Sequence, residues 1–296
     1  MIQFKSSPVE KVNFKGFDLL IKRDDLLHKD FSGNKARKFH YFLDNNFSHI
    51  TKVVSHGSNQ SNAMFSLSVL AKSKGWQYQY YTDHISGHLK ENPKGNYKYA
   101  LDNGMQVIQT SKEDIPLKQI NLEKNTLFIN EGGALKEAAY GIKQLAREIK
   151  EYKKNNNLDA LKVFLPSGTG TTALFLQKYL DIEVLTCPFV GDSAYLKKQF
   201  LELEKDEAFH PVILEPRKKY HFGKLYKSSY ELWLQLKEKT GIEFDLLYDP
   251  VGWDTLLYHL EKKDIELSCD YLYIHQGGII GNETMVERYE YKYKNK

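Results

Sequence analysis

The sequence lacks the features that mark several classes of protein. Its only cysteines, Cys187 and Cys269, have no metal-binding or Cys-x-x-Cys spacing, which excludes a disulfide framework and fits a reducing cytoplasm. No apolar run approaches the roughly 18 residues of a membrane-spanning helix, and we expect neither a membrane segment nor a signal peptide. The 42 basic and 38 acidic residues nearly cancel, so no nucleic-acid partner is expected.

The 296 residues are 41% hydrophobic, enough for one large or two ordinary domains. Strand-like apolar runs alternate with helix-like stretches, which predicts an α/β fold with parallel-type sheets covered by helices on both faces. Ligands of such sheets bind in the loops that follow the strands. The expected strands are 17–21, 52–55, 76–81, 105–109, 126–130, 161–165, 183–188, 212–214 and 271–275, and the expected helices are 35–45, 61–74, 138–152 and 171–180.

One predicted strand-to-helix loop reads Ser167-Gly168-Thr169-Gly170-Thr171-Thr172. Its glycines let backbone N–H groups face an anion, and the helix N-terminus adds partial positive charge. It lacks the Gly-Lys-Ser/Thr ending of a nucleotide-binding loop and the Gly-x-Gly-x-x-Gly of a dinucleotide site. We therefore interpret it as a site for a phosphate monoester, the alternative being an ordinary tight turn.

A second loop carries the polar run Ser58, Asn59, Gln60, Ser61 and Asn62 between a short strand and a helix. Its donors at a helix start suit a carboxylate or a planar cofactor, although an ordinary N-cap would need similar residues.

Lys35 lies in the first turn of a predicted helix, where the helix dipole disfavours its ammonium form. A neutral amine at that position is able to form a Schiff base, whereas the alternative is one more solvated surface lysine.

Three histidines leave alternatives open. His275 precedes a glycine turn and is either a structural histidine or a pocket residue. The i,i+4 pair His84 and His88 encloses Ser86-Gly87 and has no evident third ligand, so no metal site is expected.

No Gly-x-Ser-x-Gly elbow supports a serine hydrolase.

A phosphate loop, a reactive lysine and a polar loop at a helix start together suggest pyridoxal phosphate. The sequence resembles the 1-aminocyclopropane-1-carboxylate (ACC) deaminase and D-cysteine desulfhydrase family of tryptophan-synthase-β-like, fold type II enzymes. The matching stretches are KRDDL at 22–26, GNKARKF at 33–39, SNQSNAM at 58–64, KGNY at 94–97, EGGALKEAAYG at 131–141, SGTGTT at 167–172, YDPV at 248–251 and YIHQGG at 273–278.

The resemblance implies a role for each matching residue. Lys35 would bond covalently to the cofactor, Asn62 would bind its ring oxygen, and residues 167–172 would bind its phosphate. Ser61 would contact the substrate or attack it, with Ser58, Asn59 and Gln60 beside it. Placing these groups around one cofactor predicts a large cofactor-binding domain (residues 1–38 and 126–296) and a small domain (39–125).

Two motifs depart from the family. After Asp249-Pro250-Val251 the family has Tyr-Glu in ACC deaminases or Tyr-Thr in desulfhydrases, whereas this chain has Gly252-Trp253. The Tyr that assists chemistry and the partner of the ring nitrogen are then missing, unless Asp254 or Thr255 replaces that partner. Where the family has a Tyr-Gly signature, this chain has Phe222-Gly223. Tyr220, two residues earlier, is then the candidate substrate contact.

The expected function is deamination of a small amino acid to a 2-oxo acid and ammonia. Because the chain departs from the family at these two motifs, elimination from a substrate such as D-cysteine is favoured over ring opening of ACC. The alternative is a non-catalytic or substrate-diverged pyridoxal-phosphate-binding protein. The resemblance also implies a cytoplasmic homodimer.

Overall fold

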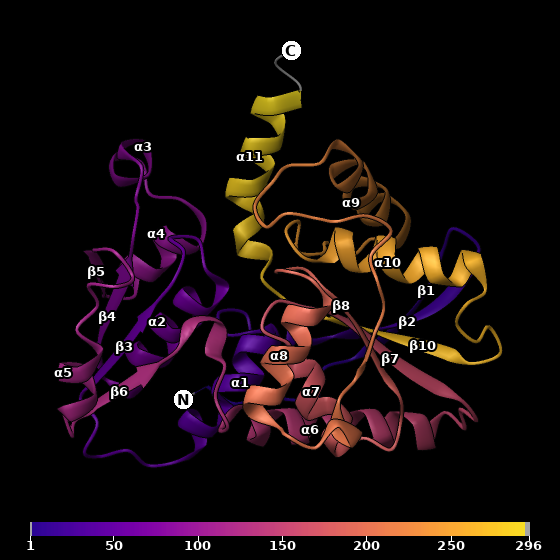
Figure 1. Cartoon of the computed structure of the whole chain (residues 1–296), viewed down its shortest axis with the longest axis horizontal. Coiled ribbons are helices and arrows are strands. Elements are labelled where there is room, and N and C mark those ends of the chain that lie inside the picture. Colours follow the sequence, from indigo (N-terminus) through magenta and orange to yellow (C-terminus); the bar gives the residue numbers. More distant parts are fainter. Residues whose placement is uncertain (1, 294–296) are drawn as a thin grey trace.

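The computed structural model describes residues 2–293, which form two sheets (Figure 1). The larger sheet has the order β1-β2-β10-β7-β8-β9, and only its β1–β2 pair is antiparallel. Its strands are β1 (Val9–Phe14), β2 (Phe17–Arg23), β7 (Leu161–Ser167), β8 (Val184–Pro188), β9 (Val212–Ile213) and β10 (Asp270–His275).

Helices cover both faces of this sheet, and the side chains of its strands alternate between two cores. In β10, Tyr271 and Tyr273 face a core shared with α9 (Lys227–Thr240), α10 (Asp249–Lys262) and α11 (Asn282–Tyr293). Leu272 and Ile274 face the opposite core, shared with α6 (Ala138–Asn155) and α7 (Thr171–Tyr179). Helix α8 (Ser193–Leu203) packs on α7.

The smaller sheet is entirely parallel, in the order β5-β4-β3-β6. Its strands are β3 (Lys52–His56), β4 (Gln77–Thr82), β5 (Met105–Gln109) and β6 (Thr126–Ile129). One face packs on α1 (Gly33–Asp44), α2 (Asn62–Lys74) and α4 (Gly95–Asp102), and the other lies toward α5 (Leu117–Leu122). Helix α3 (Gly87–Glu91) precedes α4, and four short 3-10 helices complete the fold at Asp24–Leu26, Glu131–Gly133, Glu207–Phe209 and Ile279–Gly281.

The α/β class with two parallel-type sheets is as expected, but the predicted boundary at residue 126 needs correction. Residues 126–129 form β6, which pairs with β3, so the small sheet extends to Ile129. The other predicted boundary, after residue 38, falls inside α1, which lies between the two sheets in Figure 1. No helix among residues 2–293 is long and apolar enough to cross a membrane.

A buried ionic network fixes α1 from the side opposite Lys35. The Arg37 guanidinium pairs with Asp24 at 2.8 Å and with Glu148 of α6 at 2.6 Å. Lys22 of β2 pairs with the second oxygen of Glu148 at 2.7 Å, and Ser7 donates to Asp24 at 2.6 Å. Burial alone would raise the pKa of Asp24, but the charge and hydrogen bonds of Arg37, with smaller effects of Lys22 and Ser7, together hold that pKa below its ordinary value.

Candidate active site

The predicted functional loops meet at the carboxyl ends of β3, β7 and β10, beside the first turn of α1. Gln276, just after β10, holds these parts together. It accepts from the backbone and side-chain nitrogens of Asn34 at 2.9 and 2.8 Å, and its Nε2 donates to the Pro166 carbonyl at 2.7 Å. Gly33, at φ +68°, allows this approach, since a Cβ there would lie 1.9 Å from the Gln276 oxygen.

Lys35 presents its amine at this junction. The Nζ atom donates to Asn34 Oδ1 at 3.3 Å, and the side chain is partly buried. Burial lowers the pKa of Lys35 to about 8, against the opposing effect of the Asp245 carboxylate. About a tenth of the amine is therefore neutral, and hence nucleophilic, at pH 7.

The glycine loop has the form expected of an anion site. Gly170, at φ +70°, begins α7, and a Cβ there would lie 2.4 Å from the Phe200 ring. The hydrogen bonds within the described residues use none of the backbone N–H groups of residues 168–172. The buried Thr172 hydroxyl also has no partner, and the Thr169 and Thr171 hydroxyls are 3.1 Å apart. These donors at a helix start fit a phosphate group.

Two details of this loop differ from the prediction. Strand β7 runs on through Ser167, so the Ser167 hydroxyl lies inside the sheet, 2.7 Å from Thr186 of β8, and is not free for phosphate. The sequence analysis also missed Lys38, one turn after Lys35. Its buried Nζ donates to the Gly132 carbonyl at 3.0 Å and to Thr169 at 3.5 Å, which places a second amine at the loop. Burial and the neighbouring Lys35 charge lower the pKa of Lys38 well below its ordinary value.

The polar loop after β3 is fixed by its own side chains. Ser61 caps α2 by accepting from the Ala63 and Met64 N–H groups at 3.2 and 3.4 Å. Asn59 donates to the His84 carbonyl at 2.7 Å, and Gln60 donates to the Lys94 carbonyl at 3.1 Å.

The remaining two residues of this loop have separate partners. The Ser58 carbonyl accepts from the Tyr80 hydroxyl at 2.9 Å. Asn62 hydrogen-bonds the Asp245 carboxylate, which connects the loop after β3 to the segment before α10, beside Lys35.

A tyrosine and an acid also stand at 248 and 249, four residues before the positions where the sequence analysis looked for them. Tyr248 is partly buried and lies against the glycine loop, where a Cβ on Gly168 would be 3.4 Å from its ring. Asp249 follows it and is fully buried. The spacing Asp-x-x-Tyr-acid therefore occurs at 245–249, as an alternative to the reading that starts at Asp249.

Gly252 and Trp253 serve packing. A Cβ on Gly252 would lie 2.7 Å from the Tyr273 hydroxyl and 3.0 Å from Pro166, so glycine lets α10 approach the sheet. Trp253 is fully buried and stacks on Tyr273 at 4.8 Å. Thr255 donates to a carbonyl of its own helix at 2.7 Å and is not a replacement partner.

Asp249 and Asp245 form a buried acidic pair. Asp249 accepts from the Tyr273 hydroxyl at 2.7 Å and from the Asp245 N–H at 2.9 Å. Burial and the neighbouring Asp245 charge raise the pKa of Asp249 well above its ordinary value, and burial raises the pKa of Asp245 to about 6. With a pKa of about 6, Asp245 is largely ionised at neutral pH.

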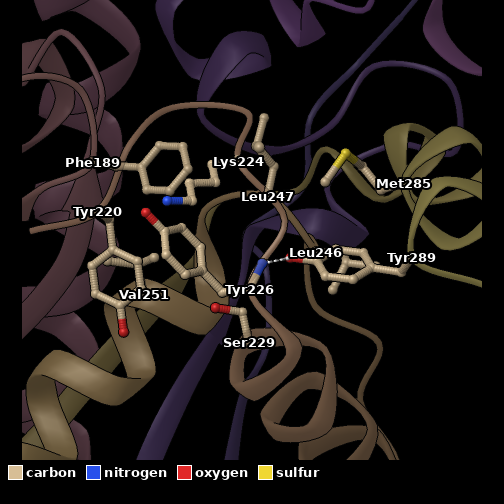
Figure 2. Close-up of a pocket in the computed structure, with 10 residues that line it drawn as sticks. All are labelled: Phe189, Tyr220, Lys224, Tyr226, Ser229, Leu246, Leu247, Val251, Met285 and Tyr289. Carbon is tan, nitrogen blue, oxygen red and sulfur yellow. Dashed lines mark hydrogen bonds between the residues drawn. The ribbon is translucent and has the colours of Figure 1, made fainter. Parts of the chain in front are cut away.

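Tyr220, predicted to contact the substrate, packs in one cluster with Phe189 and Tyr248. Its hydroxyl donates to Asp254 at 2.9 Å and points away from Phe189 in Figure 2. The pocket drawn there has a volume of about 10 Å³, room for roughly one water and not for an amino acid. Phe222 is half-exposed, and its ring centroid lies 5.6 Å from that of Phe189 and 6.4 Å from that of Tyr248.

His275 has a structural role in the fold. Its Nε2 lies 2.8 Å from the Glu243 carbonyl and its Nδ1 accepts from the Gly277 N–H at 3.2 Å, which fixes the turn after β10. Within the described part of the chain, no three His, Cys, Asp or Glu side chains gather as a metal site would require.

Known proteins share both the sequence and the fold. The chain is 27% identical over 288 residues to a protein of Pyrococcus horikoshii, spanning 90% of this chain and 86% of that one. It is 28% identical over 304 residues to a protein of Pyrococcus abyssi, spanning 92% and 89%. Both are named provisionally as 1-aminocyclopropane-1-carboxylate deaminases. No family model matches the chain.

Solved structures agree on the fold. An ACC deaminase homologue aligns with a TM-score of 0.79 at 23% identity, covering 98% of this chain and 94% of that one. A threonine deaminase from T.th. aligns with a TM-score of 0.67 at 12% identity, covering 93% and 92%. This is fold type II of the pyridoxal-phosphate enzymes, as predicted. The chain is therefore a distant relative of the ACC deaminase family and has the tryptophan-synthase-β-like fold.

Proposed function

We propose that this protein is a pyridoxal-phosphate-dependent deaminase that converts a small amino acid to a 2-oxo acid and ammonia. One observation carries the proposal: the amine of Lys35, with its pKa lowered to about 8, lies at the junction of the glycine loop and the polar loop. The unpaired N–H groups of residues 168–172 and the Lys38 amine, which donates to Thr169 of the same loop, suit the cofactor phosphate. Lys35 would hold the cofactor covalently, and Asn62 would bind its ring oxygen.

When bound, pyridoxal phosphate supplies an electron sink for the bond that breaks at Cα. The protein must then move protons. Lys35, which would hold the cofactor, would also serve as the base at Cα when its amine is free. Tyr248 holds a proton at its hydroxyl because burial raises its pKa, so it is available as an acid beside the loop. Asp249 directly follows Tyr248. By that position it would correspond to the acid that partners the ring nitrogen in ACC deaminases.

This tyrosine and acid change the expected substrate. An acid at the ring nitrogen keeps the nitrogen protonated and strengthens the electron sink, which ring opening of ACC requires because ACC has no Cα hydrogen. The presence of Tyr248 and Asp249 thus favours ACC, whereas their inferred absence had favoured D-cysteine.

The substrate prediction is tested by Tyr248→Phe. The wild type should convert ACC and water to 2-oxobutyrate and ammonia, and the variant should lose about 100-fold or more in kcat, because an acid group contributes about that much. Parallel assays with D-cysteine follow pyruvate, sulfide and ammonia. A wild type that consumes only D-cysteine would refute the ACC assignment, and one that releases ammonia from neither compound nor any other small amino acid would refute deamination. Tyr258→Phe, within helix α10, which begins directly after Tyr248, is the matched control.

The lowered pKa of Lys35 predicts how covalent loading depends on pH. With a pKa of about 8, the neutral fraction rises about tenfold from pH 7 to pH 9 and then levels off. An ordinary lysine would instead gain about 100-fold over that interval and continue to rise. Stopped-flow absorbance after mixing cofactor-free protein with pyridoxal phosphate measures the rate. A rate that climbs steadily to pH 10 would contradict the assignment.

We also propose, from the resemblance, that the protein is a homodimer in the cytoplasm that binds no nucleic acid. Sedimentation equilibrium at several concentrations would test the assembly.

A further inference from the structure

Asn96, at the start of α4, lies beneath the polar loop and takes no part in the function proposed above. It is a buried polar residue, 1% exposed. Its Nδ2 atom donates to the Gln60 carbonyl at 2.9 Å and to Asn62 Oδ1 at 2.6 Å. Both hydrogens of its amide nitrogen are therefore used on the loop that faces Lys35.

These contacts fix which way each amide points. A backbone carbonyl only accepts, so the Asn96 atom that faces Gln60 must be its nitrogen. The second hydrogen of that nitrogen requires an acceptor, so Asn62 presents Oδ1 to Asn96. The Asn62 Nδ2 group then points the other way, toward the Asp245 carboxylate.

Asp245, at the other end of this series of hydrogen bonds, requires the same orientation of the Asn62 amide. Asp245 accepts through Oδ1 from the Leu247 and Tyr248 N–H groups, at 2.9 and 2.6 Å. As an ionised carboxylate it is an acceptor only, so it also requires the nitrogen of Asn62. One Nδ2 hydrogen of Asn62 serves Asp245, and the other remains for a further acceptor.

We infer that Asn96 is a positioning residue that orients the Asn62 amide so that its nitrogen faces the cofactor's ring oxygen. The inference rests on the proposed function, because it requires a bound pyridoxal phosphate. If the amide turned over, Asn62 Oδ1 would face both the Asp245 carboxylate and the ring oxygen, and three acceptors would then repel one another.

The segment that carries Asn96 is itself held by the large domain. The Gly95 N–H donates to Glu283 of α11 at 2.9 Å, and Lys94 forms an ion pair with Glu287 of the same helix. A Cβ on Gly95, at φ +55°, would lie 3.0 Å from Gln60 Oε1. This packing keeps Asn96 at a fixed distance from Asn62.

Asn96→Asp tests the role by replacing the donor with an acceptor of the same shape. We expect about tenfold or more weaker binding of pyridoxal phosphate, in fluorescence titrations of cofactor-free protein, and a shifted absorption band of the bound cofactor. Asn92→Asp adds the same charge at the exposed end of α3 and should leave both unchanged. If Asn96→Asp does not fold, Asn96→Ala serves in its place.

A double-mutant cycle shows whether Asn96 acts through Asn62. In the Asn62→Ala background, changing Asn96 should weaken binding by less than about twofold further. If the two losses multiply instead, or if Asn96→Asp binds the cofactor like the wild type, the positioning role is wrong while the proposed function stands. If the wild type itself binds no pyridoxal phosphate, the proposed function fails and this role fails with it.

Discussion

Lys35→Ala should lose the visible absorption of a lysine-bound cofactor and lower kcat by at least about 1,000-fold, because it removes the nucleophile and the base together. The structure gives Lys35 the lowered pKa and the central position that this role requires. Absorbance of the purified variant and borohydride trapping followed by peptide mass mapping measure the covalent bond.

Lys29→Ala is the matched control, since the Lys29 side chain is 85% exposed in the loop before α1 and should change neither property. Trapped cofactor on Lys38 or another lysine in the wild type would show that Lys35 has been misassigned.

Arg37→Leu should give the largest loss of stability, about 3–5 kcal/mol in the free energy of unfolding. The substitution leaves Asp24 buried without its guanidinium and removes one of the two cations on Glu148. Replacing a whole buried ionic network by apolar side chains often changes the stability little. Removing one partner alone is strongly destabilising, because the remaining charge is then buried with neither a partner nor water. Urea unfolding of cofactor-free protein, followed by circular dichroism, measures the change.

The exposed pair of Lys98 and Asp102 provides the comparison. Lys98→Leu should change the same free energy by less than about 1 kcal/mol, since water screens that pair. Equal effects of the two substitutions would mean that the network around Arg37 does not stabilise the fold.

The sequence was informative where a local pattern has a single physical explanation. A strand, a glycine-rich turn and a helix start predict an anion site, and the structure places the unpaired N–H groups of residues 168–172 there. It was less informative about where each element ends. Strand β7 continues two residues past the predicted 165, and its alternation turns the Ser167 hydroxyl toward β8.

The missed acid and tyrosine have a different cause. Asp249-Pro250-Val251 and Asp245-Leu246-Leu247 are two candidate starting points for one motif, and short matches do not decide between them. The packing distinguishes the two starting points, because Trp253 lies in the core whereas Tyr248 lies against Gly168. Lys38 was missed for a similar reason: its contact with Thr169 joins residues that are distant in the sequence.

The strand order also has a consequence for synthesis of the chain. Strand β10, the last in the sequence, lies in the middle of the large sheet, between β2 and β7. A nascent chain can complete the four strands of the small sheet once Ile129 has emerged from the ribosome. Its large sheet stays in two separate pieces until residue 275 emerges. A transcript cut short before β10 would therefore give a protein with a complete small sheet and two exposed strand edges, a form prone to aggregation.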